Sequence, residues 1–137
     1  MNARPRWRTV DAARAADAPY RHFSTLIDRG IFHLAENDVA TTGPGISREL
    51  TRESIYRLAV TAALARAGIN YRLAASIVDD FAATGADDAF PVHLLADLAE
   101  GGRLISVGEP AGIAIAANLG PLLAAVESRL SQMDPIP

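Results

Sequence analysis

Two short blocks near the N-terminus decide the fold: TVDAARAA at residues 9–16 and YRHFSTLIDR at residues 20–29, separated by DAP at residues 17–19. The first block predicts a short helix, in which the Thr9 hydroxyl accepts from the free N–H groups at the helix start. Pro19 is favourable in the first turn of a second helix. Phe23, Leu26 and Ile27 give this second helix one apolar face. Two short helices joined by a tight turn form a helix-turn-helix pattern.

The residues after this pattern predict a β-hairpin. The apolar run Ile31 to Leu34 predicts one strand, and residues 46–50 predict the return strand. Between them lies Gly43-Pro44-Gly45, which we expect at the tip of the hairpin. Such a hairpin, placed directly after a helix-turn-helix, would form a wing.

Two further helices are expected after the wing. The first begins at a cap on Thr51, reaches Ala67, and is closed by Gly68. Its apolar residues form two faces, one with Ile55, Leu58, Ala59 and Ala62, the other with Val60 and Leu64. We therefore expect it to be central and buried on two sides. The second begins at a cap on Asn70, and its apolar stripe comprises Leu73, Ala74, Ile77, Val78 and Phe81.

The remaining residues predict a smaller unit, separated by a polar boundary at residues 83–88. Residues 91–99 predict a helix with Val92, Leu95 and Leu98 on one face. Residues 103–107 and 112–116 predict two strands joined by a turn at 108–111. Asn118 caps a last helix whose apolar stripe must be covered either by this hairpin or by a second copy of the chain. That stripe comprises Leu119, Leu122, Leu123, Val126, Leu130 and Met133.

Composition and charge limit the class of protein. A chain of 137 residues fits one domain, or a compact domain with a small appendage. It has no cysteine, no apolar run long enough for a membrane span, and no apolar segment in its charged first residues, so we expect a cytoplasmic protein. The net charge of −3 divides unevenly: residues 1–78 carry +4 and residues 79–137 carry −7. Contact with a polyanion would therefore fall to the first half.

The sequence gives no indication of catalysis, of a cofactor or of a metal. It has no nucleophile elbow, no serine–histidine–aspartate order and no paired carboxylates with a shared cleft, so we do not expect an enzyme. His22, His33 and His93 lie far apart, without acids at ligand spacing. Asp79-Asp80 and Asp87-Asp88 lack the glycine of a calcium loop, which favours solvated acids.

Polar residues of the second helix are the first candidates for nucleic-acid contact. Tyr20, Arg21 and His22 open the helix and either contact bases and phosphates or form a solvated face. Arg29 at its end either binds phosphate or stabilises the negative helix terminus. Arg8 belongs to an N-terminal arginine group, Arg4 to Arg8, that is either an arm on DNA or a solvated terminus with Trp7 folded onto the core.

The order and spacing of these blocks resemble the DNA-binding domain of the MerR-like superfamily over roughly residues 7–83, about three-fifths of the chain. The residues that carry the resemblance are Thr9-Val10, Ala12-Ala13, Phe23, Asp28-Arg29-Gly30-Ile31, Arg48-Glu49-Leu50-Thr51-Arg52-Glu53, Ile55, Leu58, Leu64, Ala67-Gly68-Ile69 and Ile77.

This resemblance implies a winged helix-turn-helix with one helix in the major groove, a wing along the backbone, and a dimer on a palindromic site. By matching positions, it places His22, Ser24 and Thr25 against DNA and Arg48 against phosphate, and we add Arg52 from the same block. The family usually carries an arginine where this chain has Ser24 and aromatic residues where it has Thr25 and Leu26. It also has a long dimerisation helix and often a metal or drug site, neither of which is implied here.

We therefore expect a mainly α protein with a small β component: a winged helix-turn-helix at residues 7–83 and a small helix–hairpin–helix unit at residues 89–137. The expected function is sequence-specific binding of double-stranded DNA as a homodimeric transcriptional regulator, without membrane contact or a small-molecule ligand. The expected dimer contacts are Leu119, Leu122, Leu123, Val126 and Leu130. Two alternatives are a phage-type packaging (small terminase) or excision factor with the same domain, and a protein–protein adaptor whose helix-turn-helix does not bind DNA.

Overall fold

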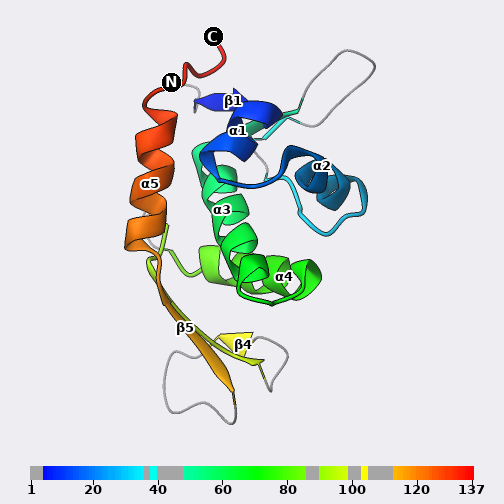
Figure 1. The fold of residues 1–137 in the computed structure, drawn as a ribbon, viewed down its shortest axis with the longest axis vertical. Coiled ribbons are helices and arrows are strands. Elements are labelled where there is room, and N and C mark those ends of the chain that lie inside the picture. The colour runs from blue at the N-terminus through cyan, green and yellow to red at the C-terminus, as the bar shows by residue number, and fades with distance from the viewer. Residues whose placement is uncertain (1–4, 36–37, 40–47, 86–89, 99–102, 105–112) are drawn as a thin grey trace.

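Helix α3 (Arg52–Arg66) lies at the centre of the computed structural model, with the other helices packed around it (Figure 1). The structure describes residues 5–35, 38–39, 48–85, 90–98, 103–104 and 113–137. The apolar residues of α3 divide between two hydrophobic clusters: Ile55, Leu58 and Ala59 belong to the first, Val60 and Leu64 to the second. The prediction of a central helix buried on two sides is confirmed.

Helices α1 (Thr9–Ala15) and α2 (Tyr20–Asp28) have nearly the predicted bounds. The tight turn between them depends on Asp17, which has a φ of 54°, and on a hydrogen bond from the Ala18 N–H to the Ala13 carbonyl. The predicted capping role of Thr9 is wrong. Thr9 is the first helical residue, and its hydroxyl donates to the Arg48 carbonyl at 3.0 Å, because strand β1 runs directly into the helix and turns this side chain inward.

A two-stranded antiparallel sheet joins the N-terminus to the start of α3. Strand β1 (Arg6–Arg8) pairs with β2 (Glu49–Thr51), and Trp7 lies opposite Leu50, both buried in the first cluster. An isolated antiparallel bridge between Val39 and Glu49 adds to the same sheet. Trp7 is thus folded onto the core. This position was expected in one of the two alternatives for the N-terminal arginine group, the solvated terminus.

The predicted strand at Ile31 to Leu34 is wrong. The N–H groups of Ile31 and Phe32 both donate to the Leu26 carbonyl, so they close the end of α2 and are not available for strand pairing. Phe32 is buried, with its ring edge-on to Phe23 at 5.2 Å between centroids. The predicted tip at residues 43–45 and the first part of the return strand, residues 46–47, lie outside the described residues.

Helix α4 (Tyr71–Ala82) forms where its sequence predicts a helix, and it packs against α3. The Asn70 side-chain oxygen accepts from the Leu73 N–H at 2.9 Å, so the predicted cap is confirmed. Ala74, Ile77, Val78 and Phe81 are buried in the second cluster, and Leu73 packs at its border. Gly68 has a φ of 102° in the short connection from α3, a conformation that favours glycine.

A three-stranded antiparallel sheet replaces the helix and hairpin predicted for the C-terminal part. Its order is β4 (Arg103–Leu104), β3 (His93–Asp97) and β5 (Ala114–Asn118). The helix predicted at residues 91–99 is wrong, because residues 93–97 form β3 and alternate, with Leu94 and Ala96 facing the second cluster. The predicted pairing of the two later strands is also wrong, since β3 lies between them. The expected turn at residues 108–111 lies outside the described residues.

Helix α5 (Gly120–Leu130) packs along α1 and α3. The Asn118 side-chain oxygen accepts from the Gly120 N–H at 3.1 Å, although the capping position itself is Leu119. Both hydrophobic clusters combine residues from 7–83 with residues of this C-terminal segment: Leu119 and Leu123 in the second, Val126 and Leu130 in the first. The Ile136 N–H donates to the Arg6 carbonyl, which brings the end of the chain beside β1 (Figure 1).

Two polar side chains, the buried Arg57 and the half-buried Asp38, hold the described residues between α2 and β2. Arg57 of α3 donates to Asp79, to the His33 carbonyl and to Ser54 at 2.9, 2.9 and 3.0 Å. The Asp38 carboxylate accepts from four groups: the N–H groups of Ala35 and Thr51, at 2.7 and 2.8 Å, the Thr51 hydroxyl at 3.0 Å, and the Ser54 hydroxyl. Together these bonds join the described residues after α2 to the first turns of α3.

Candidate nucleic-acid interface

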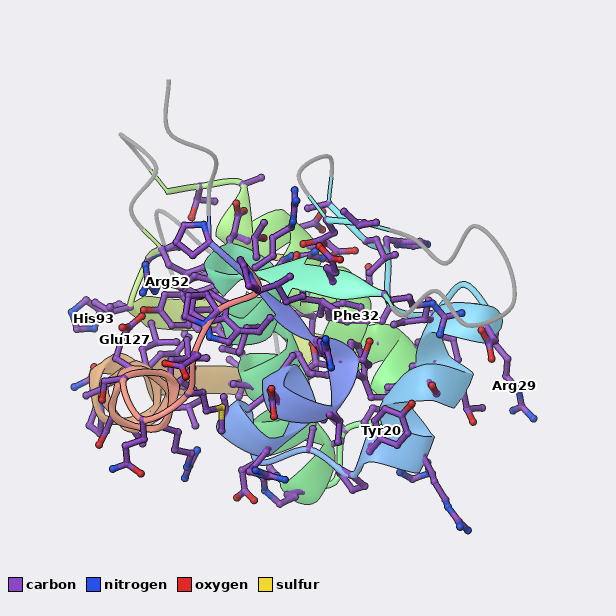
Figure 2. The ribbon with its side chains drawn as sticks, turned by 90° about the horizontal axis from the view of Figure 1, so that it is seen from above. Tyr20, Arg29, Phe32, Arg52, His93 and Glu127 are labelled. Atoms are coloured by element: carbon purple, nitrogen blue, oxygen red, sulfur yellow. The ribbon has the colours of Figure 1, made fainter. Side chains whose placement is uncertain are left out.

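Helix α2 lies at the periphery, on the side of α3 opposite to α5, in both views (Figures 1 and 2). Its inner face is fixed by Phe23 and Leu26, which are buried in the first cluster, and by Ile27, which packs against it. A helix held through its apolar face presents its opposite face in a fixed orientation. Within the described residues, the helix that was predicted to contact DNA is therefore neither covered by the C-terminal segment nor buried in the core.

The outer face of α2 is polar and exposed. Its exposed residues are Tyr20, Arg21, His22, Thr25 and Asp28, followed directly by Arg29. The Thr25 hydroxyl donates to the Arg21 carbonyl at 3.0 Å, one helical turn earlier. Arg29 points away from the rest of the molecule (Figure 2). Ser24, which the resemblance also placed against DNA, is only half-exposed at the border between the two faces.

Two residues of neighbouring helices extend this surface, and the sequence did not indicate either. The His22 ring meets Tyr71 edge-on at 5.2 Å between centroids, and the Tyr71 hydroxyl lies 3.4 Å from His22 Nδ1. Arg66, near the end of α3, donates to the Asp17 carbonyl at 2.8 Å. Arg66 ends α3 and Tyr71 begins α4. The short connection between these two helices places both residues beside the turn that precedes α2.

An open hollow of about 410 Å³ lies where these elements meet. It is lined by Asp17, Ala18, Pro19, Arg66 and Tyr71. The hollow adjoins the N-terminal turn of α2, where no side chain caps the helix and no acidic residue lies in the first turn. The first N–H groups of a helix favour negative charge, and the hollow beside them contains one basic residue, Arg66, and one acidic residue, Asp17.

Arg48 lies beside the other end of α2 and forms an ion pair with Asp28. Its side chain keeps only 21% of its surface exposed, and its backbone carbonyl is held by Thr9. Arg48, which the resemblance placed against phosphate from the wing, therefore lies beside the outer face of α2. Its charge, however, is shared with an acid of that same face.

Arg52 and Arg8 do not belong to the α2 surface. Arg52 lies near α5, on the opposite side of the molecule from Arg29 (Figure 2). It pairs with Glu127 at 2.6 Å and lies over the Trp7 ring at 5.5 Å from its centroid. Arg52 therefore lies apart from the α2 surface, where it contacts Glu127 of α5 and Trp7 of β1. Arg8 is exposed on β1, outside α2.

The residues expected at a dimer contact are used inside the chain. Leu119, Leu123, Val126 and Leu130 are all less than one-tenth exposed, and Leu122 is partly buried against the second cluster. The sequence predicted that either the C-terminal hairpin or a second copy of the chain covers this stripe. In the structure α1, α3 and the three-stranded sheet cover it together. The stripe is not an open surface for a second copy.

A hydrogen bond fixes α5 against the central helix. The Tyr56 hydroxyl of α3 donates to the Glu127 carboxylate, which also pairs with Arg52. Burial and the negative charge of Glu127 raise the pKa of Tyr56 above its ordinary value of 10.0. This contact lies with Arg52 on the α5 side of the molecule, so it serves packing and not the α2 surface.

Other site chemistry has little support among the described residues. No group of three or more histidine, cysteine or acidic side chains there is arranged to hold a metal ion. His33 lies 3.4 Å from Asp79, and His93 is exposed on β3, so the three histidines remain separate. Within the same residues, every helix is too short or too polar to cross a bilayer.

Comparisons with known proteins assign the chain to no family. No protein-family model matches the sequence, and no curated protein matches it either. The functional argument therefore rests on the α2 surface itself: a fixed, exposed helix face with arginines at both ends.

Proposed function

We propose that this protein binds double-stranded DNA through the outer face of α2 and acts as a homodimeric regulator of transcription. The observation that carries the proposal is the seating of α2, a helix anchored by buried apolar residues at the periphery with a polar, arginine-bearing face turned outward. The winged helix-turn-helix of the MerR-like superfamily remains the arrangement that we propose for residues 7–83.

The size and chemistry of this face suit a duplex groove. The major groove of B-DNA is about 12 Å wide and admits one α-helix. Arg21 and Arg29 lie at the two ends of α2, and neither forms an ion pair within the described residues. A guanidinium can bind phosphate or guanine through two parallel hydrogen bonds. The one acid on this face, Asp28, is paired with Arg48.

The test is the salt dependence of binding to random-sequence duplex DNA, followed by fluorescence anisotropy. Each phosphate contact contributes about 0.9 to the slope of log affinity against log salt. If Arg21 and Arg29 each contact one phosphate, the double variant Arg21→Ala/Arg29→Ala lowers the slope by about 1.8 and weakens binding at every salt concentration.

A matched control separates a local contact from a change in net charge. Arg29→Ala and Arg52→Ala remove the same charge, one on α2 and one on the α5 side. We expect Arg29→Ala to weaken DNA binding and Arg52→Ala to leave it nearly unchanged, with far-UV circular dichroism confirming that both variants fold. Equal loss of affinity in the two variants contradicts the assignment of α2.

The alternatives give different results in these assays. A wild-type protein that binds no duplex DNA at low salt overturns the proposal and favours the protein–protein adaptor. A protein that binds DNA as a ring of many subunits favours the packaging factor over the dimeric regulator. Sequencing of genomic fragments retained by the purified protein then measures whether binding is sequence-specific.

A further inference from the structure

Strand β5 is an edge of the three-stranded sheet. It pairs with β3 on one side, through the register His93 with Asn118 to Asp97 with Ala114. No described residue pairs with its other side. An edge strand presents unpaired N–H and C=O groups that form a template for another strand.

The hydrogen bonds at the two ends of β5 identify the outward groups. The Leu98 N–H donates to the Ile113 carbonyl, and the Leu119 N–H donates to the Val92 carbonyl, at 2.8 and 2.7 Å. In an antiparallel ladder, hydrogen-bonded residues alternate with residues that point the other way. The backbone N–H and C=O groups of residues 113, 115, 117 and 119 therefore point toward β3. Those of Ala114, Ala116 and Asn118 point outward, away from β3.

This edge lacks the usual protection against strand pairing. Natural edge strands carry charged side chains, proline or a bulge. Between Glu109 and Glu127 the sequence has no charged residue, and β5 itself reads AIAAN, without proline. The side chains of Ala116 and Asn118 are exposed, so nothing in the described part of the chain covers them.

We propose that β5 pairs antiparallel with β5 of a second copy of this chain, around a two-fold axis at Ala116. An isologous contact uses the same patch on both subunits, and antiparallel pairing of identical strands meets that condition. With Ala116 opposite Ala116 of the second copy, Ala114 lies opposite Asn118 and every outward residue is paired. Three hydrogen-bonded pairs give about six hydrogen bonds, and no like charges face each other.

The same register places the most exposed large apolar side chain among the described residues at the proposed contact. Ile113, at the start of β5, is 76% exposed. In the proposed register it lies opposite residue 119 of the second copy, whose own side chain is only 5% exposed, so the register brings Ile113 to the contact without a side-chain partner from Leu119. This inference rests on the proposed function in one respect: that function requires a dimer, and the contact supplies one. The evidence for the contact comes from the sheet and not from α2.

The experiment is a charge exchange at Ala116, read as molar mass by light scattering or sedimentation in the absence of DNA. We expect the wild type to have twice the monomer mass of 14.5 kDa. Ala116→Glu and Ala116→Arg each place like charges opposite each other across the axis, so each variant alone is expected to be monomeric. An equimolar mixture of the two is expected to recover the dimer mass, because opposite charges then meet.

The control is Ala124→Glu, the same substitution at an exposed alanine of α5. It is expected to remain dimeric. Far-UV circular dichroism shows whether each variant is folded, and the mixture tests the contact even if one variant is less stable. A monomeric wild type, dimeric single variants, or a mixture that stays monomeric each overturns the proposed contact. None of these results changes the DNA-binding assay, which tests α2 separately.

Discussion

Removing the buried guanidinium of Arg57 tests how the α2 region is attached to the core. Arg57 is 6% exposed, and it donates hydrogen bonds of 2.9, 2.9 and 3.0 Å to Asp79, to the His33 carbonyl and to Ser54. Its guanidinium also lies 4.9 Å from the centroid of the Phe32 ring. One residue thus joins α3 to α4 and to the segment that follows α2.

The size of the effect follows from these contacts. Removing one partner of a buried ion pair costs about 3–5 kcal/mol. The Asp79 side chain keeps 35% of its surface exposed, so water replaces part of the lost interaction. We therefore expect Arg57→Ala to lower the free energy of unfolding by about 3 kcal/mol, which corresponds to roughly 10 °C in Tm for a chain of this size.

Urea unfolding followed by far-UV circular dichroism measures this change. The midpoint should fall while the m-value stays constant, because the surface exposed on unfolding is nearly the same. Arg72→Ala is the matched control, since Arg72 is exposed on α4 and its loss should change stability by less than about 0.5 kcal/mol. If Arg57→Ala lowers the free energy of unfolding by no more than Arg72→Ala, the argument for a stabilising buried network is refuted.

Three further predictions concern local features. Asn70→Ala should cost about 1 kcal/mol in urea unfolding, because the Leu73 N–H loses its side-chain acceptor, and Asn70→Asp should retain most of the stability. Gly68→Ala should cost about 1–2 kcal/mol in the same assay, because its φ of 102° strains a side chain even where no atom lies within 4 Å of the added Cβ; an unchanged midpoint would contradict this. Tyr56 has a raised pKa in the folded state, so its protonated hydroxyl contributes stability that is complete below pH 10 and lost as the pH rises further. Tyr56→Phe should therefore flatten the decline of Tm at alkaline pH. An identical decline in both proteins would exclude the role of Tyr56.

The four N-terminal helices were predictable because each carries its own information. Apolar residues recur at helical spacing in α2 and α4, and Pro19 before α2 and the Asn70 cap before α4 lie next to them in sequence. The two apolar faces of α3 likewise correspond to the two clusters it joins. Local pattern therefore fixed the helices to within about one residue.

The strands were not predictable in the same way. Residues 92–98 place Val92, Leu95 and Leu98 at helical spacing and Leu94 and Ala96 at strand spacing, and a short apolar run does not distinguish the two. The partner of β2 lies more than 40 residues away, at Arg6 to Arg8. A pairing over that distance is decided by the tertiary fold and leaves no mark in either segment alone.

The position of α5 changes how the charge of the chain should be understood. An apolar stripe indicates that one face of a helix is covered, but it does not identify the element that covers it. In α5, Val126 and Leu130 pack into the same cluster as Trp7 and Phe23. This packing, with the Glu127 contacts to Tyr56 and Arg52, fixes α5 on the side of the molecule away from α2 (Figure 2). The carboxylate of Glu127 is thereby held far from Arg29, so a chain with a net charge of −3 can still present an arginine-bearing face to a polyanion. Charge distribution, and not the total, governs such an encounter.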